Sequence, residues 1–386
     1  MKFYRKTMAP LGFKANAVCC GIKRSGKLDL ALLYSILPAK SACQFTSNKI
    51  QAAPLKINKK YLKAGKNFQA IIINSGNANA FTGAVGLKDA RETTKLVAEI
   101  LSLKKNEVLV NSTGIIGKRL PLLKIKAALL PLVKGLSVSG INAAARAIMT
   151  TDTFAKSITV KFNIGSQEIT VCGIAKGAGM IAPNMACPER SRGATMLCFI
   201  LTDAKITQKD LDKALDMCVD ESFNCITVDG CMSTNDSVMV LANGAAENSL
   251  IDADKNFAVF LKALKTVCLK LAKLIIKDAE GATKFIQINV HAAKSFEDAR
   301  VVALAIANSN LFKTAVYGEN PNFGRIVAAA GSSAALVKEE LIKVRVSPLH
   351  KKEIKVDVFL GVGKRSATVY TSDLTPEYIK INAEYN

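Results

Sequence analysis

The sequence predicts a mixed α/β fold built in layers, because strand-like and helix-like hydrophobic patterns alternate along a chain long enough for more than one core. The chain has 386 residues, of which 49% are hydrophobic, and this is ample for a packed interior. Alternation of the two patterns is typical of α/β layers. We therefore expect either two substructures or one large α/β unit.

The first predicted strand and helix lie in the N-terminal third. Residues 68–74 (FQAIIIN) form an apolar run that leads into a loop rich in Asn, Gly and Ser, as expected of a buried strand. Residues 85–103 carry helical spacing, with one stripe formed by Leu87, Ala90, Thr94, Val97 and Leu101. The α/β prediction starts from this strand and helix.

The middle of the chain adds a strand and two helices. The apolar run 196–201 predicts a buried strand, and Thr207 is suited to cap the helix after it. The apolar positions of that helix are Leu211, Leu215, Cys218 and Val219. A longer helix follows, with its apolar stripe at Phe260, Leu264, Val267, Leu271 and Leu274.

Two strands are predicted nearer the C-terminus. Apolar residues alternate with polar ones at Ile286, Ile288 and Val290, and the same pattern recurs at Ile354, Val356 and Val358. Such alternation predicts strands with one buried face. We place the boundary of a C-terminal lobe near Glu280.

Composition narrows the class of protein. The formal net charge is +22, but the excess lysines are spread over predicted helix faces. They lack the neighbouring aromatic residues on which a protein that binds single-stranded nucleic acid would stack the bases. We therefore favour solvated faces over nucleic-acid binding. Apolar runs are too short to span a membrane, and the N-terminus lacks the pattern of a secretory signal. Ten scattered cysteines without a C-x-x-C pair, and two histidines, give no zinc spacing and predict reduced, buried thiols in a cytoplasmic protein.

One junction in the chain suggests nucleophilic chemistry. Residues 176–204 read as a glycine-rich turn, a proline-bearing loop and then Ala194-Thr195 at the mouth of the predicted strand. A threonine hydroxyl needs a neighbouring base, and one solution is its own α-amine, freed by cleavage of the preceding bond. Such an amine has a pKa of about 7.7–8.0, which suits a general base at neutral pH.

This junction resembles the signature of the ornithine acetyltransferase family, the bifunctional glutamate N-acetyltransferases of arginine biosynthesis. The family pattern is close to K-G-x-G-M-I-x-P-x-M-A-T-M-L. The chain matches it over 176–186 and again from Thr195, with eight extra residues, CPERSRGA, in between. Other matching segments follow in order along the chain: 21–23, 48–55, 74–83, 111–117, 149–153, 222–230, 233–236, 278–284, 318–326 and 378–385.

The resemblance implies a fold and a maturation step. The family fold is a layered α-β-β-α sandwich of the N-terminal-nucleophile type, with a smaller C-terminal lobe that would cover about 281–386. Self-cleavage at Ala194-Thr195 would give a first chain, 1–194, and a second chain, 195–386. The expected assembly holds two copies of each chain.

The resemblance also implies site residues. Thr195 would be the nucleophile, and the Thr113 hydroxyl with the Gly114 N–H would form the oxyanion hole. The substrate contacts carried over are Lys176, Thr150 (with Thr151 as the alternative in register), Glu280 and Asn382. Taken alone, 111–117 is more typical of a strand-to-helix turn, and a lysine or a glutamate at these positions is more often solvated.

The implied reaction is a ping-pong transfer of acetyl from N2-acetylornithine to glutamate, without a metal or an organic cofactor. Acetyl-CoA as a further acetyl donor is left open by the sequence. Two alternatives remain: an N-terminal-nucleophile aminopeptidase of the same fold, and an unprocessed, inactive relative in which the insert prevents cleavage. Three departures from the family pattern accompany the insert: Phe323 replaces Trp, Cys231 replaces Asp, and the chain ends at Asn386 without a final Ser or Thr.

Overall fold

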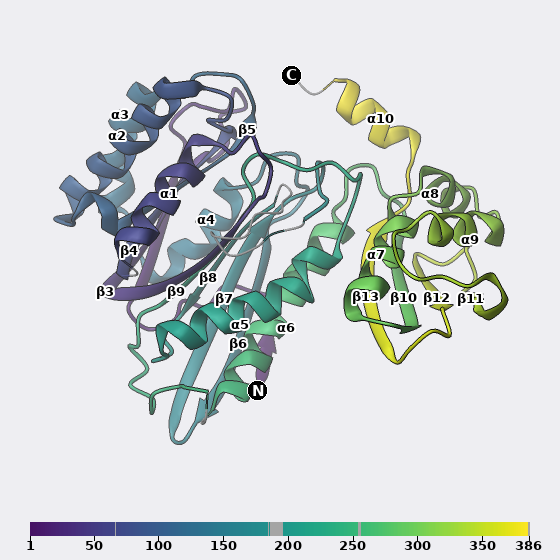
Figure 1. The fold of residues 1–386 in the computed structure, drawn as a ribbon. Helices are drawn as coiled ribbons and strands as arrows, with labels where there is room; N and C mark the ends of the chain where they lie inside the picture. The colour runs from purple at the N-terminus through teal and green to yellow at the C-terminus, as the bar shows by residue number, and fades with distance from the viewer. Residues whose placement is uncertain (66, 184, 186–195, 254–255, 385–386) are drawn as a thin grey trace.

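The computed structural model describes residues 1–65, 67–183, 185, 196–253 and 256–384 (Figure 1). In this part of the chain nine strands form one large sheet in the order β1-β6-β7-β8-β9-β3-β4-β5, with β2 beside β3. The strands are β1 (Lys2–Tyr4), β2 (Phe13–Val18), β3 (Leu30–Phe45), β4 (Asn67–Asn77), β5 (Val108–Ile115), β6 (Lys156–Ile164), β7 (Gln167–Lys176), β8 (Leu197–Thr202) and β9 (Ser237–Ala242).

The long strand β3 bends this sheet into two layers. Its first part pairs with β2 and β4, and residues 40–45 pair with β9 after a register shift between Tyr34 and Ala39. One core then lies between the layers: it joins Leu32 and Ile72 of β3 and β4 to Ile174 and Phe199 of β7 and β8. The folded sheet supplies the two inner layers of the sandwich.

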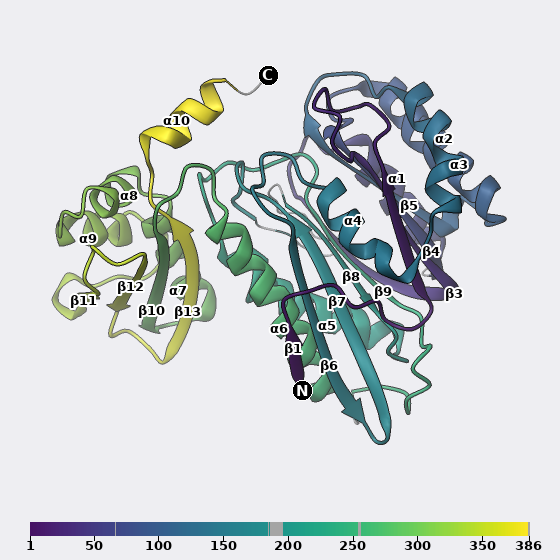
Figure 2. The ribbon, with the colours of Figure 1, turned by 180° about the vertical axis from the view of Figure 1, so that it is seen from behind.

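Helices cover the outer faces of both layers (Figures 1 and 2). One side carries α1 (Ala53–Ala64), α2 (Gly83–Leu101) and α3 (Leu122–Lys134), which share the first core, and α4 (Ile141–Ala147) packs against β2 and β3. The other side carries α5 (Gln208–Asp220) and α6 (Phe257–Lys277), whose buried residues form a second core with β6–β9. The expected α-β-β-α layering is confirmed.

Local sequence explains why α5 and α6 lie where they do. Thr207 caps α5 by accepting a hydrogen bond from the Asp210 N–H at 3.1 Å, as predicted. The predicted stripe of α6 is buried against the sheet at Phe260, Leu264, Val267 and Leu271, and partly at Leu274. A Cβ on Gly173 of β7 would lie 2.6 Å from Val267, so this glycine allows α6 to approach the strand closely.

A smaller lobe follows α6. Its sheet has the order β11-β12-β10-β13, with β10 (Phe285–Ala293), β11 (Lys343–Val346), β12 (Glu353–Phe359) and β13 (Arg365–Ser372). The alternating residues predicted on β10 and β12 are buried in its core with α7 (Phe296–Ala307), α8 (Asn310–Tyr317) and α9 (Phe323–Gly331). The last helix, α10 (Pro376–Ala383), extends from the end of β13.

The lysines of α6 are less solvated than predicted. Lys262 and Lys277 are exposed, but Lys265, Lys270 and Lys273 are half-buried. The Lys273 ammonium lies 4.6 Å from the ring centroid of Tyr370 on β13, a cation–π contact that joins α6 to the small lobe.

The prediction of buried thiols holds for six of the nine cysteines within the described ranges. Cys43, Cys172, Cys198, Cys218, Cys225 and Cys268 are buried, Cys20 is half-buried, and Cys19 and Cys231 are exposed, because both lie in loops. Across the same residues, the helices are all too short or too polar to cross a membrane.

Candidate active site

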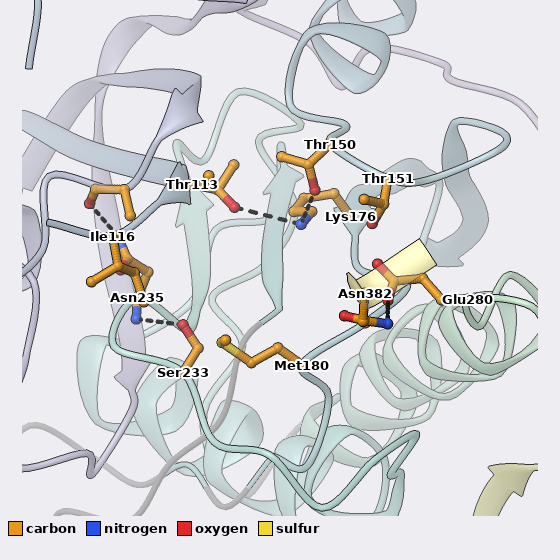
Figure 3. A pocket seen from close by; sticks show the side chains of 13 residues that line it. Thr113, Ile116, Thr150, Thr151, Lys176, Met180, Ser233, Asn235, Glu280 and Asn382 are labelled. Atoms are coloured by element: carbon orange, nitrogen blue, oxygen red, sulfur yellow. Dashed lines mark hydrogen bonds between the residues drawn. The ribbon is translucent and has the colours of Figure 1, made fainter. Parts of the chain in front are cut away.

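Most of the predicted site residues line one pocket of about 100 Å³ (Figure 3). It lies where the ends of β5 and β7 meet the loop after α4, the loop after α6, and α10. Six of the eight predicted residues line it: Thr113, Gly114, Thr150, Lys176, Glu280 and Asn382. Thr151, the alternative to Thr150, also lines the pocket.

Lys176 ends β7 and is only 4% exposed, so the solvated-lysine interpretation is wrong. Its Nζ donates a hydrogen bond to Thr150 Oγ1 at 2.8 Å and a longer one to Thr113 Oγ1 at 3.5 Å. Figure 3 shows the ammonium between these two threonines. Burial lowers the pKa of Lys176, and the neighbouring Asp152 carboxylate opposes this effect.

Thr113 and Gly114 lie inside β5, so the strand-to-helix turn expected from 111–117 taken alone is wrong at these positions. Gly114 has φ +131°, which strongly favours glycine. A Cβ there would lie 2.4 Å from the Gly76 carbonyl carbon and 2.5 Å from the Asn77 nitrogen on β4. Any side chain would push the two parallel strands apart, so glycine is required for this backbone N–H to occupy its position at the pocket.

A buried network of charges supports the Lys176 side of the pocket. Asp152 accepts hydrogen bonds from the Thr150 N–H at 2.9 Å, the Gly177 N–H at 2.7 Å and Lys156 Nζ at 2.6 Å. Lys156 Nζ also donates to Asp278 at 2.5 Å. Burial would raise the pKa of Asp152, but the Lys176 and Lys156 charges outweigh it and lower that pKa to about 2. The carboxylate thus fixes Gly177, which follows Lys176, and Thr150, whose hydroxyl accepts a hydrogen bond from Lys176.

Sequence reasoning missed this network. Asp152 and Asp278 stand in matched segments, but no role was predicted for them. The one local signal is the spacing of Asp152 and Lys156, which are four residues apart, while Lys156 and Asp278 are 122 residues apart in the chain.

The opposite wall carries a carboxylate. Asn382 Nδ2 of α10 donates to Glu280 Oε2 at 2.9 Å, and both side chains face the pocket (Figure 3). A Cβ on Gly179 would lie 2.0 Å from Glu280 Oε2, so this glycine leaves room for the carboxylate. The pocket therefore presents an ammonium on one side and a carboxylate on the other.

Asn235, another residue without a predicted role, joins two of the segments that line the pocket. Its Nδ2 donates to the Ala78 carbonyl at 2.6 Å and to the Ser112 carbonyl at 2.7 Å. Asn235 is buried and lines the pocket together with Ser233. It thus holds the loop before β9 against the strand that carries Thr113.

Ala194 and Thr195, the predicted cleavage residues, lie outside the described residues. The chain after them is well fixed: Met196 is buried, and its carbonyl accepts a hydrogen bond from the Ser237 N–H at 3.0 Å. Leu197, the first residue of β8, is the Cα partner of Lys176 on β7. The strand that follows Thr195 therefore starts beside the buried lysine of the pocket.

Comparisons with known proteins agree with one another. The sequence profile of the ArgJ family matches residues 14–386. The chain is 46% identical to an "Arginine biosynthesis bifunctional protein ArgJ" of Caldanaerobacter subterraneus over 98% of both chains. It is 43% identical to a "Glutamate N-acetyltransferase" of Methanocaldococcus jannaschii, over 98% of this chain and 97% of that protein.

Solved structures match in part of the chain. An ornithine acetyltransferase of Mycobacterium tuberculosis, crystallised with ornithine, is 41% identical, with a TM-score of 0.45. The match covers 48% of this chain and 99% of that one.

Proposed function

The chain belongs to the ArgJ family, and on that premise we propose that it transfers acetyl from N2-acetylornithine to glutamate through an acetyl-Thr195 intermediate. The observation that carries the proposal is the pocket itself: a buried ammonium, a facing carboxylate and the two oxyanion-hole candidates meet beside the start of β8. These groups fit an amino acid that carries both charges.

Maturation comes first in the proposal. The Thr195 hydroxyl attacks the carbonyl carbon of Ala194, the peptide C–N bond breaks, and the acyl group moves to Oγ1 as an ester. Water hydrolyses the ester, which leaves a carboxylate on Ala194 and a free α-amine on Thr195. The products are chains 1–194 and 195–386, which we propose assemble as two copies of each.

Acetyl transfer then follows in two half-reactions. The Thr195 amine takes the hydroxyl proton while Oγ1 attacks the acetyl carbonyl, and the oxyanion that forms is held by the Thr113 hydroxyl and the Gly114 N–H. The amide bond breaks, ornithine leaves with that proton on its α-amine, and acetyl remains on Thr195. The glutamate amine then attacks this ester and leaves as N-acetylglutamate, restoring the hydroxyl.

The charges of the pocket are complementary to those of the proposed amino-acid substrate. We propose that Lys176 binds the α-carboxylate, which donor and acceptor share, and that Glu280 and Asn382 receive the side-chain ammonium of ornithine. Thr150 is favoured over Thr151 as a contact, because its hydroxyl already binds the Lys176 ammonium. The acetyl chemistry needs no metal or organic cofactor.

Intact-mass analysis and an acetyl-transfer assay test the proposal together. Wild-type protein should give two fragments and convert acetylornithine to ornithine over many turnovers only when glutamate is present. Without glutamate it should release one ornithine per active site as acetyl-Thr195 forms, and continued release beyond that equivalent would indicate hydrolysis instead. Thr195→Ala should abolish both cleavage and transfer. A single uncleaved chain that turns nothing over would contradict the proposal. Replacing acetylornithine by acetyl-CoA tests whether that donor, which the sequence leaves open, is also used.

A further inference from the structure

Asp229 joins two segments that line the pocket, the loop after β7 and helix α10. Its Oδ2 accepts hydrogen bonds from the Met180 N–H at 2.7 Å and from the Tyr378 hydroxyl at 3.2 Å. Its Oδ1 accepts from the N–H groups of Ile181 and Cys231, both at 3.0 Å. One carboxylate therefore binds the loop after β7 and the C-terminal helix α10 at the same time.

The loop depends on these contacts. Met180 has φ +54°, a left-handed conformation that L residues disfavour, and it lines the pocket beside Gly179. The two bonds to Asp229 hold this backbone, and the Val228 N–H adds a third by donating to the Ile181 carbonyl at 2.6 Å. The turn at Met180 is thus held in place by hydrogen bonds with the segment that contains Val228 and Asp229.

Helix α10 depends on polar contacts even more. All residues of Pro376–Ala383 are described, and none of them is buried. Figures 1 and 2 show the helix extending beyond the end of β13. Its polar contacts come from Thr375, Tyr378 and Asn382, which bind the Gly281 carbonyl, Asp229 and Glu280, and Tyr378 also packs against the second core. These positions are three and four residues apart, so they share one face of the helix.

We propose that Asp229 and Tyr378 are positioning residues for the pocket. Asp229 holds the Met180 loop, and through Tyr378 it holds α10, so that Asn382 meets Glu280 where the ammonium of the amino-acid substrate binds. Thr113, Gly114 and Lys176 lie on β5 and β7, outside this linkage. Loosening it should therefore weaken substrate binding and leave the acetyl-transfer step intact. The substrate part of the inference rests on the proposed function.

The test compares Tyr378→Phe with Tyr317→Phe, an exposed tyrosine of α8 in the same lobe. Hydrogen exchange of residues 376–384 is measured without substrate, and KM and kcat for acetylornithine are measured per cleaved molecule. Loss of a bond to a charged acceptor predicts about tenfold faster exchange in α10 and about a tenfold higher KM, with kcat within about twofold. Tyr317→Phe should match the wild type in both.

Asp229→Asn provides the second arm. It should raise KM further than Tyr378→Phe, because it also disturbs the Met180 loop, and adding Tyr378→Phe to it should change α10 exchange little more. Wild-type exchange in α10 of the tyrosine variant would overturn the proposal, as would a fall in kcat at constant KM. If the wild type is cleaved but transfers no acetyl, the proposed function fails, and α10 exchange still decides the positioning role.

Discussion

Gly114→Ala probes the proposed oxyanion hole through a distance that can be worked from the structure. The new Cβ would lie 2.4 Å from the Gly76 carbonyl carbon, whereas ordinary van der Waals contact begins at about 3.4 Å, so β5 must move by about 1 Å relative to β4. Misplacement of that size costs about 100-fold in rate. Loss of one oxyanion donor costs about 100- to 1,000-fold, or about 2.7–4 kcal/mol of barrier. Both routes predict kcat reduced by at least about 100-fold.

The assay is acetyl transfer from acetylornithine to glutamate, expressed per cleaved molecule, with thermal unfolding measured alongside. Gly117→Ala is the matched control, because Gly117 also has positive φ, +82°, but a Cβ there meets nothing within 4 Å. It should lose only about 1–2 kcal/mol of stability from the left-handed backbone and keep its turnover. The reasoning is refuted if Gly114→Ala retains a tenth or more of wild-type kcat, or if both variants lose activity equally.

Three further predictions concern the buried charges and the insert. Lys156→Met leaves the Asp152 and Asp278 carboxylates without their shared countercharge and should lower the free energy of unfolding by about 3–5 kcal/mol. Lys161→Met, also on β6, breaks an exposed pair with Glu168 of β7 and should cost under about 1 kcal/mol; urea titrations measure both values. The pKa of Asp152 is lowered from 3.8 to about 2 in the folded chain, so its stabilisation of about 2 kcal/mol is complete above pH 4 and is lost as pH falls toward 2. Asp152→Asn should therefore flatten the dependence of the free energy of unfolding on pH between about pH 4 and 2. An unchanged dependence on pH would contradict the assignment. Deletion of residues 187–194, which restores the family spacing, should alter the rate of self-cleavage but leave acetyl transfer per cleaved molecule within about twofold, as seen by intact mass and turnover together.

Much of the fold follows from local pattern. The apolar stripe of α6 predicts a helix and the alternation of β10 predicts a strand, because in each element the spacing of the apolar residues places them on the face that is buried. Strand β3 does not follow in the same way. Its sequence, LALLYSILPAKSACQF, breaks its apolar run at Pro38 and Lys40, where the strand crosses from one layer to the other. That crossing is decided by pairing with β4 and β9, which no local window contains.

The site residues also fall into two groups, those that the sequence predicts and those that only the structure identifies. A family pattern predicts residues that touch substrate, so Thr113, Lys176 and Glu280 could be named from sequence and are found in one pocket. Asp152 and Asp229 act through backbone N–H groups of the loops that they hold. The partners that place these loops, the N–H groups of Gly177 and Met180, are 25 and 49 residues away from Asp152 and Asp229, so only the folded chain identifies these contacts.

The signature glycines shape the pocket, whereas Met185 and Met196, the anchors on either side of the insert, hold the chain where the insert begins and ends. Gly177 and Gly179 leave space that Ile181 and the Glu280 carboxylate fill, so this part of the signature shapes the pocket. Upstream of the insert, the Asn224 amide holds Met185 by accepting from its N–H at 2.6 Å and donating to its carbonyl at 2.8 Å. Downstream, Met196 is bound to Ser237. Because the pocket wall and both anchors lie in the described residues, we expect the eight extra residues to influence the proposed release of Thr195 rather than the proposed substrate contacts.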